Sequence, residues 1–165
     1  MADLNDIYNT RIMELAAEIP RTDRLANADA TATAHSKLCG STVTVDIVMD
    51  GDLFADYGQT VKACLLGQSS ASVVGREIVG THVDEFRNVA GEMRAMLKEG
   101  ADGPGGRWAD LRVLEPVRDY RARHASTLLV FDAIEKALAE RDAHASDAHA
   151  SDTHDERPRV AAVGA

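Results

Sequence analysis

Strict alternation of apolar and polar residues makes 41–47 the clearest strand signal in the chain. Val43, Val45 and Ile47 fall on one face of this segment, and threonines and Asp46 fall on the other. We therefore predict a sheet with one face in the core and one face in solvent.

Two neighbouring segments extend this prediction to a three-stranded antiparallel sheet. Residues 29–36 alternate with smaller apolar side chains, and residues 53–62 read as a less regular third strand interrupted by Gly58. The intervening Asp50-Gly51-Asp52 is typical of turns that join antiparallel strands. Pairing through this turn would bring the start of the second strand and the end of the third strand to the same end of the sheet.

Helical periodicity dominates the rest of the chain. Strands followed by a run of helices indicate the α+β class, in which helices pack against an antiparallel sheet. The segments with helical spacing of apolar residues are 3–19, 69–78, 83–99, 108–114 and 125–138.

Capping and breaking residues predict where these helices begin and end. Ser69 and Ser70 are candidate N-caps for the second helix, and Thr81 opens a capping-box-like start for the third. Gly100 is the expected end of the third helix, and Pro116 is expected to break the fourth.

The length of 165 residues favours one domain, which we place at 1–140, followed by a tail at 141–165. The tail repeats Asp, Ala, His and Ser in five-residue steps and has no apolar face, so we predict that it is disordered. A metal-binding histidine tail is the alternative, although a five-residue step does not return ligands to one helical face.

Charge and hydropathy exclude several classes of partner. The formal net charge is -9 and the body of the chain shows no basic cluster, which argues against a nucleic-acid partner. No apolar run approaches the roughly 20 residues needed to span a bilayer, and the first residues lack the features of a signal peptide. We therefore predict a cytoplasmic protein with no membrane partner, in which Cys39 and Cys64 do not form a structural disulfide.

The two cysteines carry the candidate chemistry. Cys64 lies between the third strand and a predicted helix start, where free amide groups and the helix dipole favour a thiolate. The thiolate is the form that binds metal or accepts sulfur. Cys39 precedes the second strand, so the predicted pairing brings both cysteines to one end of the sheet. A buried cysteine that serves only as a small hydrophobic residue is the alternative for Cys64.

Together these segments resemble the U-type iron-sulfur cluster scaffold family, the group of IscU, SufU and the NifU N-terminal domain. The resemblance runs from roughly Leu4 to Leu138, and the long separation before the last helix is most like the SufU branch. Its landmarks are Tyr8, Ser36-Lys37-Leu38-Cys39-Gly40-Ser41, Ala63-Cys64 followed by Ser69-Ser70-Ala71-Ser72, and Arg123-His124-Ala125-Ser126.

The resemblance implies a protein that holds a nascent cluster or a zinc ion through three cysteines and an aspartate. Cys39 and Cys64 match two of these ligands, whereas Ser41 stands at the aspartate position and Ser126 at the third cysteine position. His124 is a candidate third ligand, since two thiolates with imidazole resemble known zinc and Rieske-type sets. His35 is a more remote fourth candidate. An ordinary polar or capping role is the alternative for both histidines.

Three functions follow from these residues. The leading prediction is a non-enzymatic scaffold or carrier that binds iron or a cluster through Cys39 and Cys64, completed by a second protomer, a partner or glutathione. The second is a SufU-like zinc protein in which Cys64 or Cys39 accepts persulfide sulfur from a cysteine desulfurase. The third is a degenerate family member without metal that serves in interaction or regulation. The expected partners are a cysteine desulfurase and iron-sulfur acceptor proteins, with a homodimer as a further assembly.

Overall fold

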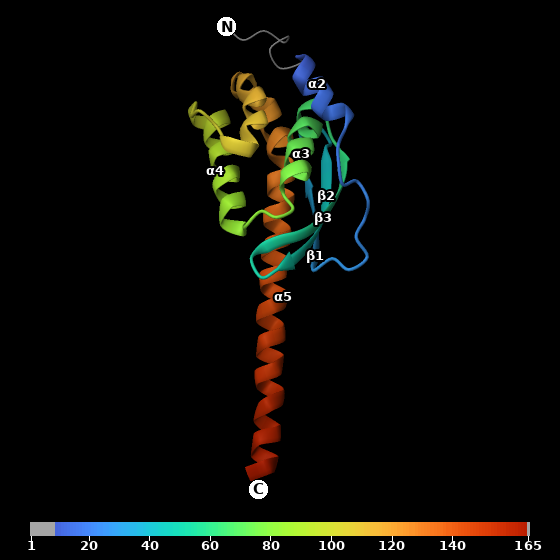
Figure 1. The fold of residues 1–165 in the computed structure, drawn as a ribbon, viewed down its shortest axis with the longest axis vertical. Coiled ribbons are helices and arrows are strands. Elements are labelled where there is room, and N and C mark those ends of the chain that lie inside the picture. The colour runs from blue at the N-terminus through green and yellow to red at the C-terminus, as the bar shows by residue number, and fades with distance from the viewer. Residues whose placement is uncertain (1–8, 165) are drawn as a thin grey trace.

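The computed structural model describes residues 9–164, with side chains described as far as His144. Its sheet has the order β1-β2-β3, and both neighbouring pairs are antiparallel. Helices α3, α4 and α5 lie together on one side of this sheet (Figure 1). The predicted α+β fold with a three-stranded antiparallel sheet is confirmed. The strands are β1 (Ala30–His35), β2 (Thr42–Asp50) and β3 (Leu53–Lys62).

The strand register brings the two cysteine-bearing segments to one end of the sheet. His35 pairs with Thr42, and Thr42 pairs in turn with Lys62. The segments that follow β1 and β3 therefore leave the sheet side by side. At the opposite end, β2 and β3 are joined through Gly51, whose φ of 61° suits a glycine in a tight turn.

Helices and 3₁₀ segments make up most of the remaining described chain. Residues 1–8, which include Leu4 and Tyr8 of the predicted first helix, lie outside the described residues. The described part of that helix begins after Asn9, whose side chain accepts a hydrogen bond from the backbone N–H of Ile12. The elements are α2 (Thr10–Ala17), α3 (Leu65–Glu77), α4 (Val83–Glu99), η1 (Gly106–Asp119), η2 (Arg121–Arg123) and α5 (His124–Gly164).

Helix α3 begins at Leu65, so the predicted N-caps at Ser69 and Ser70 are wrong. Both serines are buried inside the helix. The Ser69 hydroxyl donates to the carbonyl oxygen of Ile12 in α2, and the Ser70 hydroxyl donates to that of Thr127 in α5, each at 2.7 Å. The small serine side chains allow α3 to pack closely against α2 and α5. Their hydroxyls hydrogen-bond these neighbouring helices instead of capping α3.

Helix α4 starts and ends close to the predicted residues. His82 is the N-cap in place of Thr81, since its Nδ1 accepts from the backbone N–H of Asp84 at 3.2 Å. The Thr81 hydroxyl instead donates to the carbonyl oxygen of Glu77. Gly100 adopts a left-handed conformation with φ of 73° and ends the helix as predicted.

Element η1 is a 3₁₀ helix that continues past Pro116, so the predicted break at this proline is wrong. Apolar side chains repeat every three residues, and a 3₁₀ helix with three residues per turn places such side chains on one face. That face is buried, and its burial stabilises a 3₁₀ helix that is longer than most. Its residues are Trp108, Leu111, Leu114 and Val117.

Aromatic rings fill the space between the sheet and the helices. The ring centroids of Phe54 and Phe86 are 5.8 Å apart in an edge arrangement, and those of Phe86 and Phe131 are 6.0 Å apart in a stacked one. The apolar face of β2 is also buried, as predicted for Val43 and Val45.

The outer face of the sheet is not wholly exposed as predicted, because the connection between α2 and β1 covers Asp46. This carboxylate accepts hydrogen bonds from Arg24 Nε at 2.7 Å, from the backbone N–H of Leu25 at 3.0 Å and from the Thr31 hydroxyl. Burial would raise the pKa of Asp46, but these hydrogen bonds, led by Arg24, outweigh burial and lower it.

We expect Asp46→Asn to destabilise the protein by about 1–3 kcal/mol at neutral pH, because a buried charged acceptor loses its partners. The folded pKa lies below the unfolded value of about 3.9, so this stabilisation is present above that pH and is lost as the pH falls through the folded pKa. Urea unfolding of both proteins at neutral and acid pH measures the difference. Asp102→Asn, at an exposed aspartate, serves as the control. If Asp46→Asn is as destabilising in acid as at neutral pH, the ionised Asp46 carboxylate is not the source of the stabilisation.

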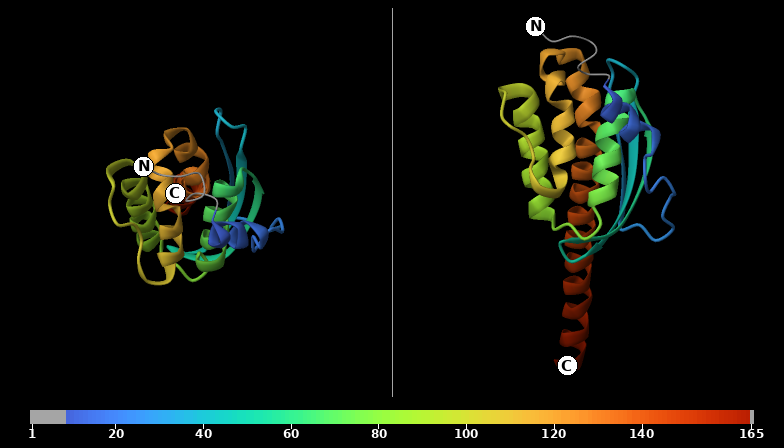
Figure 2. Two further views of the ribbon diagram at one scale, coloured as in Figure 1. Left: turned by 90° about the horizontal axis from the view of Figure 1, so that it is seen from above. Right: turned by 45° about the horizontal axis from the view of Figure 1, so that its top comes forward.

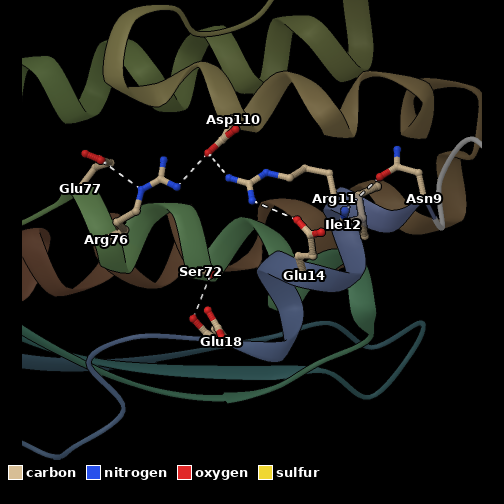
Figure 3. A network of polar contacts seen from close by, with 9 residues as sticks. All are labelled: Asn9, Arg11, Ile12, Glu14, Glu18, Ser72, Arg76, Glu77 and Asp110. Atoms are coloured by element: carbon tan, nitrogen blue, oxygen red, sulfur yellow. Dashed lines mark hydrogen bonds and ion pairs between the residues drawn. The ribbon is translucent and has the colours of Figure 1, made fainter.

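A polar network holds α2 against α3 and η1 (Figure 3). Arg11 and Arg76 donate to the same carboxylate oxygen of Asp110, at 2.7 and 2.8 Å. Hydrogen bonds from these two guanidinium groups, Arg11 first, lower the pKa of Asp110. The Ser72 hydroxyl adds a bond to the carbonyl oxygen of Glu18 at 3.4 Å. Elements α2 and η1 are therefore fixed against α3, the helix that follows Cys64.

Helix α5 begins at His124, one residue before the predicted start, and projects well beyond the sheet (Figures 1 and 2). The structure is helical over 141–164, where the sequence predicts disorder. Alanine recurs through this segment and has the highest helix propensity, which favours helix even without an apolar face. The division into a domain at 1–140 and a separate tail stays a prediction. Within residues 9–164, no helix combines the length and apolar character needed to cross a membrane.

Candidate functional site

Cys39 lies on the loop between β1 and β2 and is exposed. The loop is closed by two backbone hydrogen bonds, from Ser36 N–H to the Ser41 carbonyl at 2.8 Å and from Gly40 N–H to the Ser36 carbonyl at 2.9 Å. Gly40 has a φ of 71°, a left-handed conformation that glycine adopts without strain. The fold thus presents the Cys39 sulfur on a short, well-bonded turn.

Cys64 lies at the N-terminus of α3, where the sequence placed it. It is the N-cap residue, and its side chain makes no capping hydrogen bond, so the sulfur remains free of that role. Its carbonyl oxygen accepts from Gln68 N–H at 2.9 Å, which fixes the backbone in the first turn. The side chain is partly buried.

Ser126 brings the two cysteines together. Its hydroxyl oxygen lies 3.3 Å from the sulfur of Cys64, and the same hydroxyl is near enough to Cys39 to add to the lowering of that thiol's pKa. Ser126 is fully buried in the first turn of α5. Two cysteines far apart in sequence therefore lie near one serine, in agreement with the predicted placement at one end of the sheet.

Gly67 sets the close approach of α3 and α5 on which this contact depends. A Cβ atom at this position would lie 2.8 Å from the Cβ of Ala63 and 2.9 Å from the carbonyl oxygen of Ser126. Real Cβ contacts are essentially never this short. The absence of a side chain at Gly67 thus allows the start of α5 to reach Cys64.

Serine hydroxyls lower the pKa of Cys39 to about 7. The Ser41 hydroxyl, 3.0 Å from the sulfur, is the largest cause, and Ser36 at 3.5 Å is the second. Ser126 and the backbone of Ser41 add smaller contributions, whereas burial acts in the opposite direction. Cys39 therefore holds more thiolate at neutral pH than a free cysteine does. Sequence reasoning treated Ser41 and Ser126 only as lost ligands and missed this role, although their places at ligand positions were the available signal.

This arrangement makes a testable prediction about the reactivity of Cys39. In a metal-free Cys64→Ser protein, alkylation by iodoacetamide should follow the thiolate and reach half its maximal rate near the pKa of about 7. Ser41→Ala removes the largest cause and should move this midpoint upward, toward the free value of about 8.5. Ser70→Ala, a buried serine of α3 that does not contact Cys39, is the control. An unchanged midpoint in Ser41→Ala would show that the hydroxyl does not stabilise the thiolate.

The structure does not gather the predicted histidines with the cysteines. The Nε2 of His124 lies 3.1 Å from the carbonyl oxygens of both Val117 and Arg118, so it carries a proton and faces acceptors. His35 is exposed at the end of β1. Among the residues whose side chains are described, no group of three or more His, Cys, Asp or Glu could hold a metal ion. A ligand role for His124 would require its ring to leave these carbonyl oxygens, and we expect it to keep them.

Comparisons with known proteins identify the family. No family model matches the chain. The crystal structure of the N-terminal part of a nitrogen-fixing NifU-like protein from Brucella abortus superimposes with a TM-score of 0.82. The sequence identity to this Brucella protein is 50%. The match covers 84% of the chain with Cys39 and Cys64 and 96% of the Brucella chain. The chain belongs to the NifU-like, U-type family.

Two further relatives agree with this U-type assignment. The iron-sulfur cluster assembly scaffold protein IscU of Thermotoga maritima is 21% identical over 132 residues, which cover 80% of the U-type chain and 92% of that protein. A putative iron-sulfur cluster assembly scaffold protein for the SUF system from Fervidobacterium islandicum shares the fold. Its TM-score is 0.75 and its sequence identity is 23%. The match covers 82% of the U-type chain and 99% of the Fervidobacterium chain. The predicted resemblance to this family is confirmed, and the SufU branch is consistent with the second likeness.

Proposed function

We propose that the U-type chain is a scaffold or carrier in iron-sulfur cluster assembly that holds iron or a nascent cluster as cargo through Cys39 and Cys64. The observation that carries this proposal is the placement of both cysteines near Ser126, whose hydroxyl lies 3.3 Å from the Cys64 sulfur and adds to the lowering of the Cys39 pKa. Thiolates are the preferred ligands of iron-sulfur clusters. Exposure of Cys39 and its thiolate fraction at neutral pH suit a site that must load and release its cargo. The name of the Thermotoga maritima relative supports the same function.

Two thiolates from one chain leave a cluster site half complete. Iron-sulfur clusters are commonly held by four thiolates, so two copies of the chain that each supply Cys39 and Cys64 would complete the set. We propose this homodimer as the loaded form, with a partner protein or glutathione as other sources of the missing ligands. Light scattering before and after loading tests the proposal, which requires the mass to double with the cluster.

A resident zinc ion does not fit the donors that the structure brings together. Structural zinc sites take four ligands from Cys, His, Asp or Glu, whereas the described residues of one chain offer here two thiols with the hydroxyls of Ser36, Ser41 and Ser126. Neutral hydroxyls are poor zinc ligands. No step of the function is therefore assigned to zinc.

Sulfur acceptance is the second candidate function, and the exposed Cys39 favours it. The Cys39 thiolate would attack the outer sulfur of a persulfide on a cysteine desulfurase, forming a sulfur–sulfur bond on Cys39. The desulfurase cysteine leaves as its thiolate, so no further oxidant or reductant is needed. Cys64, the acceptor first expected from the sequence, is partly buried and is the less accessible of the two thiols. A cysteine desulfurase and iron-sulfur acceptor proteins are the partners we propose.

Anaerobic purification followed by absorption spectroscopy and analysis of iron, zinc and acid-labile sulfide tests these functions together. Visible absorption with iron and sulfide supports the scaffold. Colourless protein that gains a labile sulfur from a desulfurase supports sulfur acceptance. A protein that takes up neither after reconstitution overturns both and leaves the metal-free interaction role.

A comparison of histidine and cysteine variants tests the ligand set. We expect His124→Ala to retain its iron, because the ring is engaged by backbone carbonyls, whereas Cys64→Ala should lose it. Loss of iron from His124→Ala, with unchanged thermal unfolding, would show that His124 is a ligand of the iron.

A further inference from the structure

A second site candidate is a cleft of about 620 Å³ between α4, the 3₁₀ segments and the start of α5. These elements lie side by side in Figure 2. Neither cysteine lines the cleft, nor does any of the serines around them. Its walls carry cations from separate parts of the sequence, namely Arg94 and Lys98 from α4, Arg118 from η1 and Arg121 from η2. Asp132 is the one carboxylate in the lining.

Two of these cations are already neutralised. Arg94 donates to Asp132 at 2.8 Å and to Glu135 at 2.7 Å, and Arg118 pairs with Glu115. The other two, Lys98 and Arg121, have no hydrogen-bond or ion-pair partner among the residues with described side chains. Both are exposed. In a chain with a net charge of -9, a cleft with two unpaired cations on separate elements is complementary to an anion.

The shape and lining favour a polypeptide over a small anion. Lys98 and Arg121 come from different elements, so a segment with several carboxylates can reach both in an extended conformation. The lining also includes Leu97 and Leu128, but both are buried in the core, so the exposed surface of the cleft is polar. Small-molecule sites, in contrast, are mostly enclosed and apolar with a few convergent polar groups. The first turn of α5 at His124 adds the partial positive charge of a helix N-terminus.

We propose that this cleft, formed by α4, η1, η2 and the start of α5, binds a carboxylate-rich segment of a partner protein through Lys98 and Arg121. The proposal does not depend on the cargo site, because the cysteines lie outside the cleft. Loss of one activity therefore does not imply loss of the other.

The test measures binding of a short fluorescein-labelled oligoglutamate peptide to the full chain by anisotropy. We expect binding that weakens as salt is raised, since exposed charge pairs are screened. The double variant Lys98→Glu/Arg121→Glu should weaken it by about tenfold or more, because like charges then face the peptide. The matched control is Arg87→Glu/Arg112→Glu, which makes the same change of charge on α4 and η1 outside the cleft.

Each outcome decides for or against the proposal. Binding that is retained in the control and lost in the cleft variant, with both variants unfolding at the temperature of the parent, supports it. No binding, equal loss in both variants, or equal binding of an oligoglutamine peptide of the same length would overturn it. Displacement of the peptide by inorganic pyrophosphate at a far lower concentration would overturn it in favour of a phosphate site. Iron and sulfide content of the same variants reads out the cargo site separately.

Discussion

Ser126→Cys should hold a reconstituted cluster at least about tenfold more strongly than the unchanged protein, since even changes around metal ligands alter affinity by about 10–100-fold. The Ser126 hydroxyl already lies 3.3 Å from the Cys64 sulfur and adds to the lowering of the Cys39 pKa. A sulfur in its place provides a third thiolate next to the other two, at the position where the family has its third cysteine. The measurement is the rate at which a chelator removes iron after anaerobic reconstitution.

The control for this gain is Ser70→Cys, which also adds a thiol at a fully buried serine. Ser70 donates to the backbone of Gly67 and Thr127 and does not contact either cysteine sulfur. Its variant should therefore lose iron at the rate of the unchanged protein. If Ser126→Cys loses iron as fast as Ser70→Cys, the hydroxyl does not mark the cargo site.

Gly67→Ala should destabilise the protein by about 1–3 kcal/mol, the usual cost of overpacking a close contact. The new Cβ would lie 2.9 Å from the carbonyl oxygen of Ser126, and backbone cannot move aside as a flexible side chain can. Relief requires α3 and α5 to separate, which draws Ser126 away from Cys64. We therefore expect loss of stability in urea unfolding together with weaker retention of iron.

Gly91→Ala is the matched control, because Gly91 is also inside a helix but a Cβ there meets nothing within 4 Å. Alanine is the better helix former, so this variant should gain about 0.5–1 kcal/mol. Opposite signs at the two glycines are expected from the packing alone. A gain of stability at Gly67 similar to that at Gly91 would show that α3 and α5 do not meet as closely as described.

The sheet could be predicted from sequence because its signals are local. Alternation in 41–47 specifies the buried face, and the turn at Gly51 specifies antiparallel pairing of β2 with β3, as the structure has it. The predictions that failed concern contacts between distant residues. Nothing near Asp46 in the sequence indicates that Arg24 and Leu25 fold over it. The prediction that Asp46 is exposed on the solvent face of its strand is therefore wrong.

The failures in the helices have a similar cause. Ser69 and Ser70 are typical N-caps by residue type, and only the positions of α2 and α5 make their hydroxyls interior hydrogen-bond donors. Pro116 is a helix breaker by type, but the three-residue apolar spacing around it favours a 3₁₀ helix held against the core. Local propensity was overruled by packing in each case.

The cysteine site was predictable in part. Strand pairing alone places Cys39 and Cys64 at one end of the sheet, and the structure places both near Ser126. The hydroxyls around Cys39 were not predicted, because a hydrogen bond depends on side-chain geometry that spacing does not specify. The cationic cleft was missed for the same reason, since Lys98 and Arg121 are adjacent only in the fold.

Anaerobic reconstitution with iron and sulfide of Cys39→Ser and Cys64→Ser, beside the unchanged protein and Ser126→Ala, tests the central claim most directly. That claim is that both sulfurs hold one cargo. We predict that each cysteine variant loses almost all of its bound iron and acid-labile sulfide, whereas Ser126→Ala, which removes a neutral hydroxyl, keeps both. Full iron and sulfide in either cysteine variant would contradict it.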